Sequence, residues 1–216
     1  IRRVFIRKVN IILMIQLSIT FGCIALFHFT PPVREYVQSQ NGRWLYFASY
    51  GVFLVTYFAL VCSQRAARRY PLNLILLGIL TLSMRYMMGV ISAYYKIESI
   101  LIAVGITAVV CFGVTLFSFQ TKYDFTSCFG VLFVMSLALL AFGIVCAFTY
   151  SRILYTVYAG LGVVAFSIFL AVDVQLIMGG KRHEISAEDH IFASLMLYID
   201  IIYIFVFILS LVSNRE

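Results

Sequence analysis

The sequence contains few charged residues for a chain of 216. Lys, Arg, Asp and Glu together make up 12% of it, whereas hydrophobic residues make up 63%. Soluble domains have about a quarter charged and about half apolar residues, and a small soluble domain has too little interior to bury more. The composition therefore excludes an ordinary soluble domain and favours a protein whose solvent is lipid.

Motifs of common enzyme and metal sites are also missing. The chain has neither Gly-x-Ser-x-Gly nor His-Glu-x-x-His, which argues against a serine hydrolase and a zinc protease. Its five cysteines have neither Cys-x-x-Cys nor Cys/His spacing, so they indicate no zinc site and no disulfide framework. We expect no enzymatic activity and no cofactor.

Long apolar stretches are what the sequence has in abundance. A helix that crosses the hydrocarbon core of a bilayer needs roughly 20 mostly apolar residues. Such windows cover residues 9–29, 44–62, 72–94, 98–119, 127–149, 152–178 and 190–213. We predict an all-α, multi-pass integral membrane protein, a seven-transmembrane helical bundle that forms a single domain over residues 1–216. The first window lacks the cleavage site of a signal peptide, so it is interpreted as a retained span.

The distribution of positive charge predicts an orientation. The net charge of +7 could suggest nucleic-acid binding, but the basic residues lie in short loops between apolar windows. Ten fall in the N-terminal segment and the second, fourth and sixth loops, and five on the opposite side. The positive-inside rule therefore places the N-terminus in the cytosol. We expect the lipid bilayer as a partner and no nucleic acid, and the side of the C-terminus stays open.

Three ionisable residues lie well inside the windows: Asp173, Asp200 and Arg85. Each costs roughly 2.5–3.5 kcal/mol at a helix centre if it stays charged and unpaired, so they should face the bundle interior and one another. Helix rise places Arg85 and Asp200 roughly 15–20 Å from the cytosolic ends of their helices, and Asp173 roughly 9 Å. Depth alone thus matches Asp200 better to Arg85 than to Asp173.

A contact between the two carboxyl groups would carry chemistry. Two carboxylates held together away from water cannot both ionise cheaply, so one proton tends to be shared and the pair titrates as a unit. Such a pair could sense pH, and its ionised form could transiently bind calcium, a hard cation that prefers oxygen ligands. The alternative is a hydrogen bond between helices with no role in transport.

Paired aspartates in adjacent spans also occur in intramembrane aspartyl proteases, where a shared proton helps to activate water. Those enzymes need Gly-x-Gly-Asp at the second aspartate, but here Leu197-Tyr198-Ile199 precede Asp200. They also need a Pro-Ala-Leu segment, and the only prolines are Pro31, Pro32 and Pro71. The sequence therefore argues against a protease.

Three segments carry a resemblance to a known family. They are FLAVDVQLIMGGKRHEISAEDHIFASLMLYIDIIYIFVFIL (169–209), FSFQTKYDFTSC (117–128) and RRYPLNLILLGILTLSM (68–84). Together they resemble the Lifeguard branch of the Bax inhibitor-1 superfamily, over essentially the whole chain. The resemblance implies six helices around a central C-terminal seventh. It also implies a pH-sensitive calcium leak and suppression of cell death, with Asp173 and Asp200 as the hydrogen-bonded proton sensor.

The resemblance further implies a basic residue that can take the sixth-helix aspartate as an alternative partner, and Arg65 is the nearest counterpart. Arg85 departs from the pattern, since a small neutral residue is usual there. A positive charge at Arg85 would oppose calcium passage and favour the ionised form of Asp200. The implied membrane is that of the endoplasmic reticulum, Golgi, endolysosomes or cell surface. A second hypothesis is a scaffold that restrains death receptors or calcium channels by contact without conducting ions.

Overall fold

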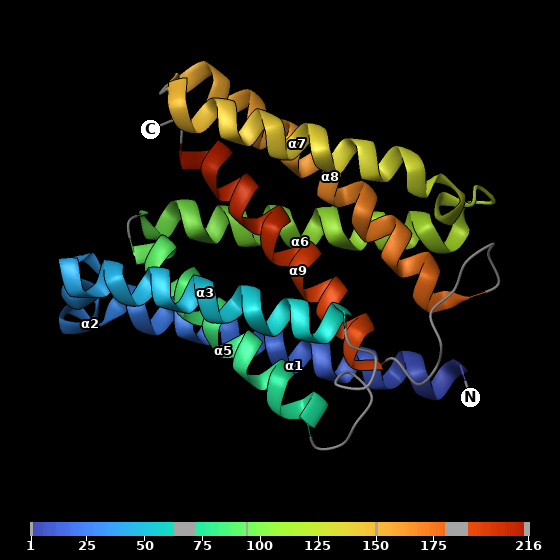
Figure 1. Ribbon diagram of the computed structural model, residues 1–216, viewed down its shortest axis with the longest axis horizontal. Coiled ribbons are helices and arrows are strands. Elements are labelled where there is room, and N and C mark those ends of the chain that lie inside the picture. The colour runs from blue at the N-terminus through green and yellow to red at the C-terminus, as the bar shows by residue number, and fades with distance from the viewer. Residues whose placement is uncertain (1, 63–71, 94, 150, 180–189, 214–216) are drawn as a thin grey trace. The chain divides into compact units, whose positions relative to one another are not determined.

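The computed structural model describes residues 2–62, 72–93, 95–149, 151–179 and 190–213, and every regular element within them is helical (Figure 1). The helices are α1 (Arg2–Phe29), α2 (Pro31–Gln38), α3 (Gln40–Cys62), α5 (Leu72–Ala93), α6 (Ile97–Gln120), η1 (Phe125–Cys128), α7 (Phe129–Thr149), α8 (Arg152–Met178) and α9 (His190–Ser213). The chain divides into two compact units. The first comprises residues 3–97 and 186–195, and the second comprises residues 98–185 and 196–216.

Five of the predicted spans are long and apolar enough in the described residues to cross a membrane. They are Arg3–Phe29, Leu74–Ala93, Ile97–Gln120, Arg152–Met178 and Ala193–Ser213. The windows 44–62 and 127–149 are also helical, as parts of α3 and α7. Among the described residues, however, only five helices are both long and apolar enough to cross a membrane. The chain is therefore an all-helical protein with several candidate spans, and the count of seven stays a prediction, as does the central position of the C-terminal helix.

Prolines separate the first span from the next helix. The first helix ends at Phe29, Thr30 is extended, and Pro31 and Pro32 occupy the first positions of α2. Proline suits a helix start because the N–H it lacks would have no intrahelical partner there. The first span therefore ends before these prolines, which start a short extra helix.

In the first unit, α3 lies against α5, and α2 contacts both (Figure 1). Val90 and Ala93 of α5 are buried, with Phe27 of α1 and Tyr46 of α3 packed against them. Hydrogen bonds fasten the same end of the unit. Gln38 donates to the carbonyl of Ala93 at 3.1 Å, and a ring nitrogen of His28 donates to the carbonyl of Tyr95 at 3.0 Å. The ends of α1, α2 and α5 are therefore held together by polar as well as apolar contacts.

In the second unit, α7 and α8 run side by side (Figure 1). Helix α8 starts at a Ser151 cap, whose hydroxyl accepts from the N–H of Leu154, and ends at Gly179, which has a φ of 77°. Glycine adopts such a positive φ without strain, so Gly179 caps the C-terminal end of α8.

Candidate functional site

The second unit brings together the carboxyl groups of Asp173 on α8 and Asp200 on α9, which form a side-chain hydrogen bond. Asp200 is only 6% exposed, and Asp173 is partly buried. A carboxylate can only accept hydrogen bonds, so a bond between two carboxyl groups requires that one of them carries a proton. The two carboxyl groups are thus close enough to interact, and a shared proton between them belongs to the proposal below.

Packing of α8 against α9 explains why these two side chains meet. Gly162 of α8 faces the ring of Phe207, which would lie within 2.7 Å of any added Cβ atom. Phe166 stacks on Tyr203 with ring centroids 4.9 Å apart. Residue numbers thus rise on α8 as they fall on α9, and the antiparallel register continues toward the Asp173–Asp200 contact. The small residue and the aromatic stack fix the alignment that positions the carboxyl groups.

Buried apolar side chains flank both aspartates on their own helices, and a thiol lies near Asp200. Apolar neighbours of the aspartates along their own helices are buried, among them Val172, Val174 and Ile202. One carboxyl oxygen of Asp200 (Oδ2) is buried without a hydrogen-bond partner. Cys111 of α6, a free thiol, interacts electrostatically with Asp200. An unpaired carboxyl oxygen in such surroundings is poorly solvated, so binding of a proton or a cation would stabilise the pair.

A fully buried glutamine, Gln175, lies two residues beyond Asp173 and ties α8 to the connection between α6 and α7. Its Oε1 accepts from the N–H of Phe125 at 2.8 Å. Its Nε2 donates to the carbonyl of Tyr123 at 3.0 Å and to that of Ser118 at 3.5 Å. Both ends of the amide are therefore used, and α8 is fastened to the α6–α7 connection two residues along the helix from Asp173.

That connection is also ordered by its own polar side chains. Asp124 accepts from the N–H of Thr126 at 3.0 Å and from its hydroxyl, and the hydroxyl of Ser127 donates to the Asp124 carbonyl at 2.7 Å. The hydroxyl of Tyr123 shares a hydrogen bond of 3.2 Å with the thiol of Cys128, which raises the pKa of Tyr123 above its ordinary value. The segment that Gln175 holds is thus a structured turn that leads into η1.

The sequence predicts two further site residues, Arg85 and Arg65. Arg85 belongs to the first unit, so its predicted ion pair with Asp200 stays a prediction. Arg65 lies outside the described residues. The described residues contain no group of three or more His, Cys, Asp or Glu side chains that could hold a metal ion. Two carboxylates are fewer ligands than a resident calcium site needs, so calcium is considered below only as a permeant ion.

Comparison with known proteins identifies the family. The family model described as "Inhibitor of apoptosis-promoting Bax1" matches residues 2–216. The chain belongs to the Bax inhibitor-1 family. Its relatives include protein lifeguard 3 of Mus musculus and of Homo sapiens, each 47% identical over 220 residues. That alignment covers 100% of this chain and 71% and 70% of the two relatives. Protein lifeguard 4 of Mus musculus is 32% identical over 210 residues, which are 97% of this chain and 84% of the relative.

The Bax inhibitor-1 match and the apolar helices support the same class of protein. A chain with five helices able to cross a bilayer is a multi-pass integral membrane protein in contact with lipid. Membership of the Bax inhibitor-1 family suggests an anti-apoptotic membrane protein. The carboxyl pair lies on α8 and α9, within the segment whose sequence carries the resemblance to the Lifeguard branch.

Proposed function

We propose that this protein is a pH-sensitive calcium leak channel of a cellular membrane, gated by the Asp173–Asp200 pair. The observation that supports the proposal is the hydrogen-bonded carboxyl pair between two apolar helices. Ionisable residues are expensive inside a membrane and usually mark ion or proton pathways. The proposal therefore predicts that substitution of Asp200 changes calcium flux.

In the closed state one proton joins the two carboxyl groups and holds α8 to α9 at this level. When the proton leaves, the same groups carry two negative charges. Two unit charges 4 Å apart repel by about 4 kcal/mol at an effective dielectric constant of 20. That is comparable to the contacts that hold two helices together locally, so deprotonation favours separation of the aspartates. The gate therefore opens as pH rises.

The open state offers calcium what the closed state does not. Two ionised carboxylates supply up to four oxygen atoms, and water completes the six to eight ligands that calcium takes. Such a site is charged enough to attract the ion and incomplete enough to release it, as conduction requires. The carboxyl pair thus acts as gate and as transient binding site.

The proposed cellular role is suppression of apoptosis. It is supported by the family match, whose description names inhibition of the apoptosis-promoting Bax1, and by similarity to the lifeguard proteins. A leak that lowers the calcium content of a store would lower the signal available on its release. The intracellular and plasma membranes remain alternatives for the site of action.

Purified protein in calcium-loaded liposomes tests the proposal. We expect calcium efflux to be low at acidic pH and to rise as the pH becomes neutral and then mildly alkaline, because the shared proton is lost on that side. The measurement is the initial efflux rate reported by an indicator dye in the external medium, with protein-free liposomes as the control.

Absence of protein-dependent calcium flux at every pH would contradict the proposal. The scaffold hypothesis would then be favoured, in which the protein restrains death receptors or calcium channels by contact. It would also gain if suppression of cell death survived a substitution that abolished flux.

A further inference from the structure

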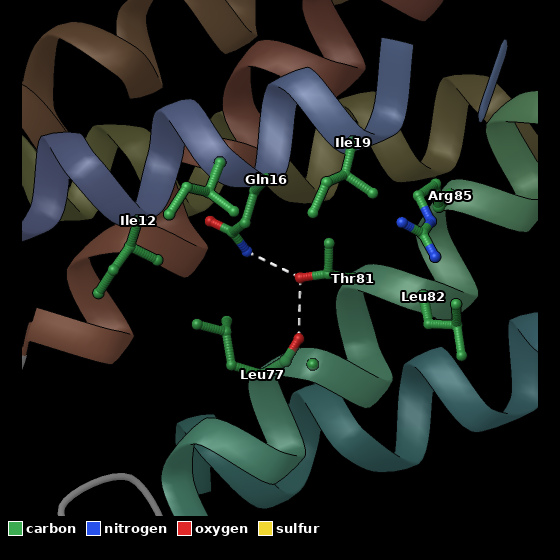
Figure 2. A pocket seen from close by; sticks show the side chains of 9 residues that line it. Ile12, Gln16, Ile19, Leu77, Thr81, Leu82 and Arg85 are labelled. Atoms are coloured by element: carbon green, nitrogen blue, oxygen red, sulfur yellow. Dashed lines mark hydrogen bonds between the residues drawn. The ribbon is translucent and has the colours of Figure 1, made fainter. Parts of the chain in front are cut away.

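The first unit contains a pocket between α1 and α5, and three polar side chains contribute to its lining. It has a volume of about 360 Å³, and its walls are aliphatic apart from Gln16, Thr81 and Arg85. Figure 2 shows the amide of Gln16 directed at Thr81, and the guanidinium of Arg85 at one end of the pocket beyond Ile19. All residues that line this pocket belong to the first unit, whereas the two aspartates belong to the second.

Two polar atoms of the pocket lining are buried without partners. Gln16 donates from Nε2 to the hydroxyl of Thr81 at 2.9 Å, and Thr81 donates to the carbonyl of Leu77 at 2.8 Å. That chain uses the amide nitrogen of Gln16 but leaves its Oε1 without a hydrogen bond. The Nε of Arg85 is likewise buried and unpaired. Buried polar groups are nearly always paired, so an unpaired donor and acceptor in one pocket indicate that a ligand supplies the partners.

The charge of Arg85 indicates the sign of that ligand. An arginine is always protonated, and its planar guanidinium matches carboxylate and phosphate oxygens. Among the described residues of the first unit Arg85 has no ion pair, and the nearby thiol of Cys23 is no counter-ion. An anionic group at this end of the pocket would therefore accept from the buried Nε of Arg85, which has no hydrogen bond to a described residue.

The position of the pocket indicates that the rest of the ligand is apolar. Arg85 lies eight residues before the end of α5 at Ala93, which corresponds to about 12 Å along the helix. From Arg85 the pocket continues toward Leu77, away from that end of α5, and its rim includes the exposed side chains of Ile15 and Leu82. A molecule with its anionic group at Arg85 would direct its apolar part toward the middle of the bilayer, as a lipid does.

We propose that this pocket binds a single-chain anionic lipid, with its carboxylate or phosphate at Arg85 and its acyl chain along α1 and α5. A volume of about 360 Å³ is near the lower end of the range for small-molecule sites and suits one chain. A two-chain phospholipid would have to place its glycerol and its second chain deeper in the membrane than the end of α5 at Ala93. A single-chain lipid has no second chain to place there.

Electron paramagnetic resonance on the protein in phosphatidylcholine vesicles tests the proposal. The probes are spin-labelled stearic acid, lysophosphatidic acid and lysophosphatidylcholine, which share a chain and differ in the headgroup. At mildly alkaline pH we expect stearate and lysophosphatidic acid to be immobilised about tenfold more strongly than the zwitterionic probe, the ratio that one charge-assisted hydrogen bond supports. Preference for only one of the two anions would show which headgroup the site takes.

Two variants separate the headgroup from the chain. Arg85→Ala should bring the preference for anions to parity, whereas Arg43→Ala, which removes an exposed arginine of α3, should not change it. Gly78→Leu should also abolish the preference, because residue 78 lines the pocket and a side chain there has open space. The thermal midpoint of each variant checks folding. An anion preference that persists in both Arg85→Ala and Gly78→Leu, or its absence in the wild type, would overturn the proposal, and neither outcome depends on calcium conduction.

Discussion

We expect the Asp200→Asn variant to lose the pH dependence of its calcium flux. The side-chain amide of asparagine has nearly the shape of the carboxyl group and donates a hydrogen bond to Asp173 at every pH. The contact between α8 and α9 therefore no longer needs a proton and persists when Asp173 is ionised. A hydrogen bond to a charged group is worth about 1.5–3 kcal/mol, so flux at alkaline pH should fall about 10- to 100-fold. Liposome efflux rates measured across the pH range give the result.

The reciprocal variant and a surface variant serve as controls. Asp173→Asn should give the same flat response, because asparagine at 173 can donate to Asp200 in the same way. Glu98→Gln makes the same chemical change at an exposed residue in the first turn of α6, and it should leave the pH response as in the wild type. Wild-type flux and pH response in Asp200→Asn would contradict gating by the pair.

The second large effect is expected for Gln175→Leu, which should destabilise the second unit. Leucine has a similar volume but leaves the N–H of Phe125 and the carbonyl of Tyr123 without the partners they have in the wild type. These two hydrogen bonds are partly buried, and each is worth about 0.5–1.5 kcal/mol, so the unfolding free energy should fall by about 1–3 kcal/mol. Chemical or thermal unfolding in detergent, followed by circular dichroism, measures the change.

The matched control is Gln120→Leu, at an exposed residue in the last turn of α6. That substitution should change the unfolding free energy by no more than about 0.5 kcal/mol. If the two variants unfold alike, the hydrogen bonds of Gln175 do not stabilise the connection. We also expect Gln175→Leu to weaken the pH response of flux, because α8 loses a fixed neighbour two residues from Asp173.

Much of the fold could be predicted from the sequence because lipid imposes simple rules on it. The length and apolarity of α1, α5, α6, α8 and α9 are properties of single segments, and the five corresponding windows agree with helices able to span a bilayer. The backbone preferences of proline and glycine also determine where some helices begin and end. Proline at 31 and 32 and glycine at 179 end or begin helices whatever the rest of the chain does.

The contact of Asp200 could be predicted only in part. The cost of an intramembrane charge indicated that Asp200 needs a partner, but helix rise alone matched it in depth to Arg85 rather than Asp173. Within the second unit the register of α8 on α9 brings Asp173 to Asp200, and that register depends on Gly162 against Phe207. Such a pairwise fit between helices is not contained in the hydropathy of either one.

Gln175 and Cys111 were missed for a different reason. A glutamine in an apolar helix has no spacing that indicates its partners, and those of Gln175 are backbone groups more than 40 residues away. Cys111 was considered only as one of five cysteines whose spacing indicates no zinc site and no disulfide framework. Its place near Asp200 requires the fold of α6. A polar residue two positions from an intramembrane carboxylate was the only available signal.

Infrared difference spectroscopy, run on the reconstituted protein alongside calcium efflux, tests most directly whether one shared proton closes the channel. The carbonyl stretch of a protonated carboxyl group should disappear over the same pH interval in which efflux rises, and Asp200→Asn should lack that transition. If the band persists through the interval in which efflux rises, or if it titrates unchanged in Asp200→Asn, the proton between Asp173 and Asp200 does not control the passage.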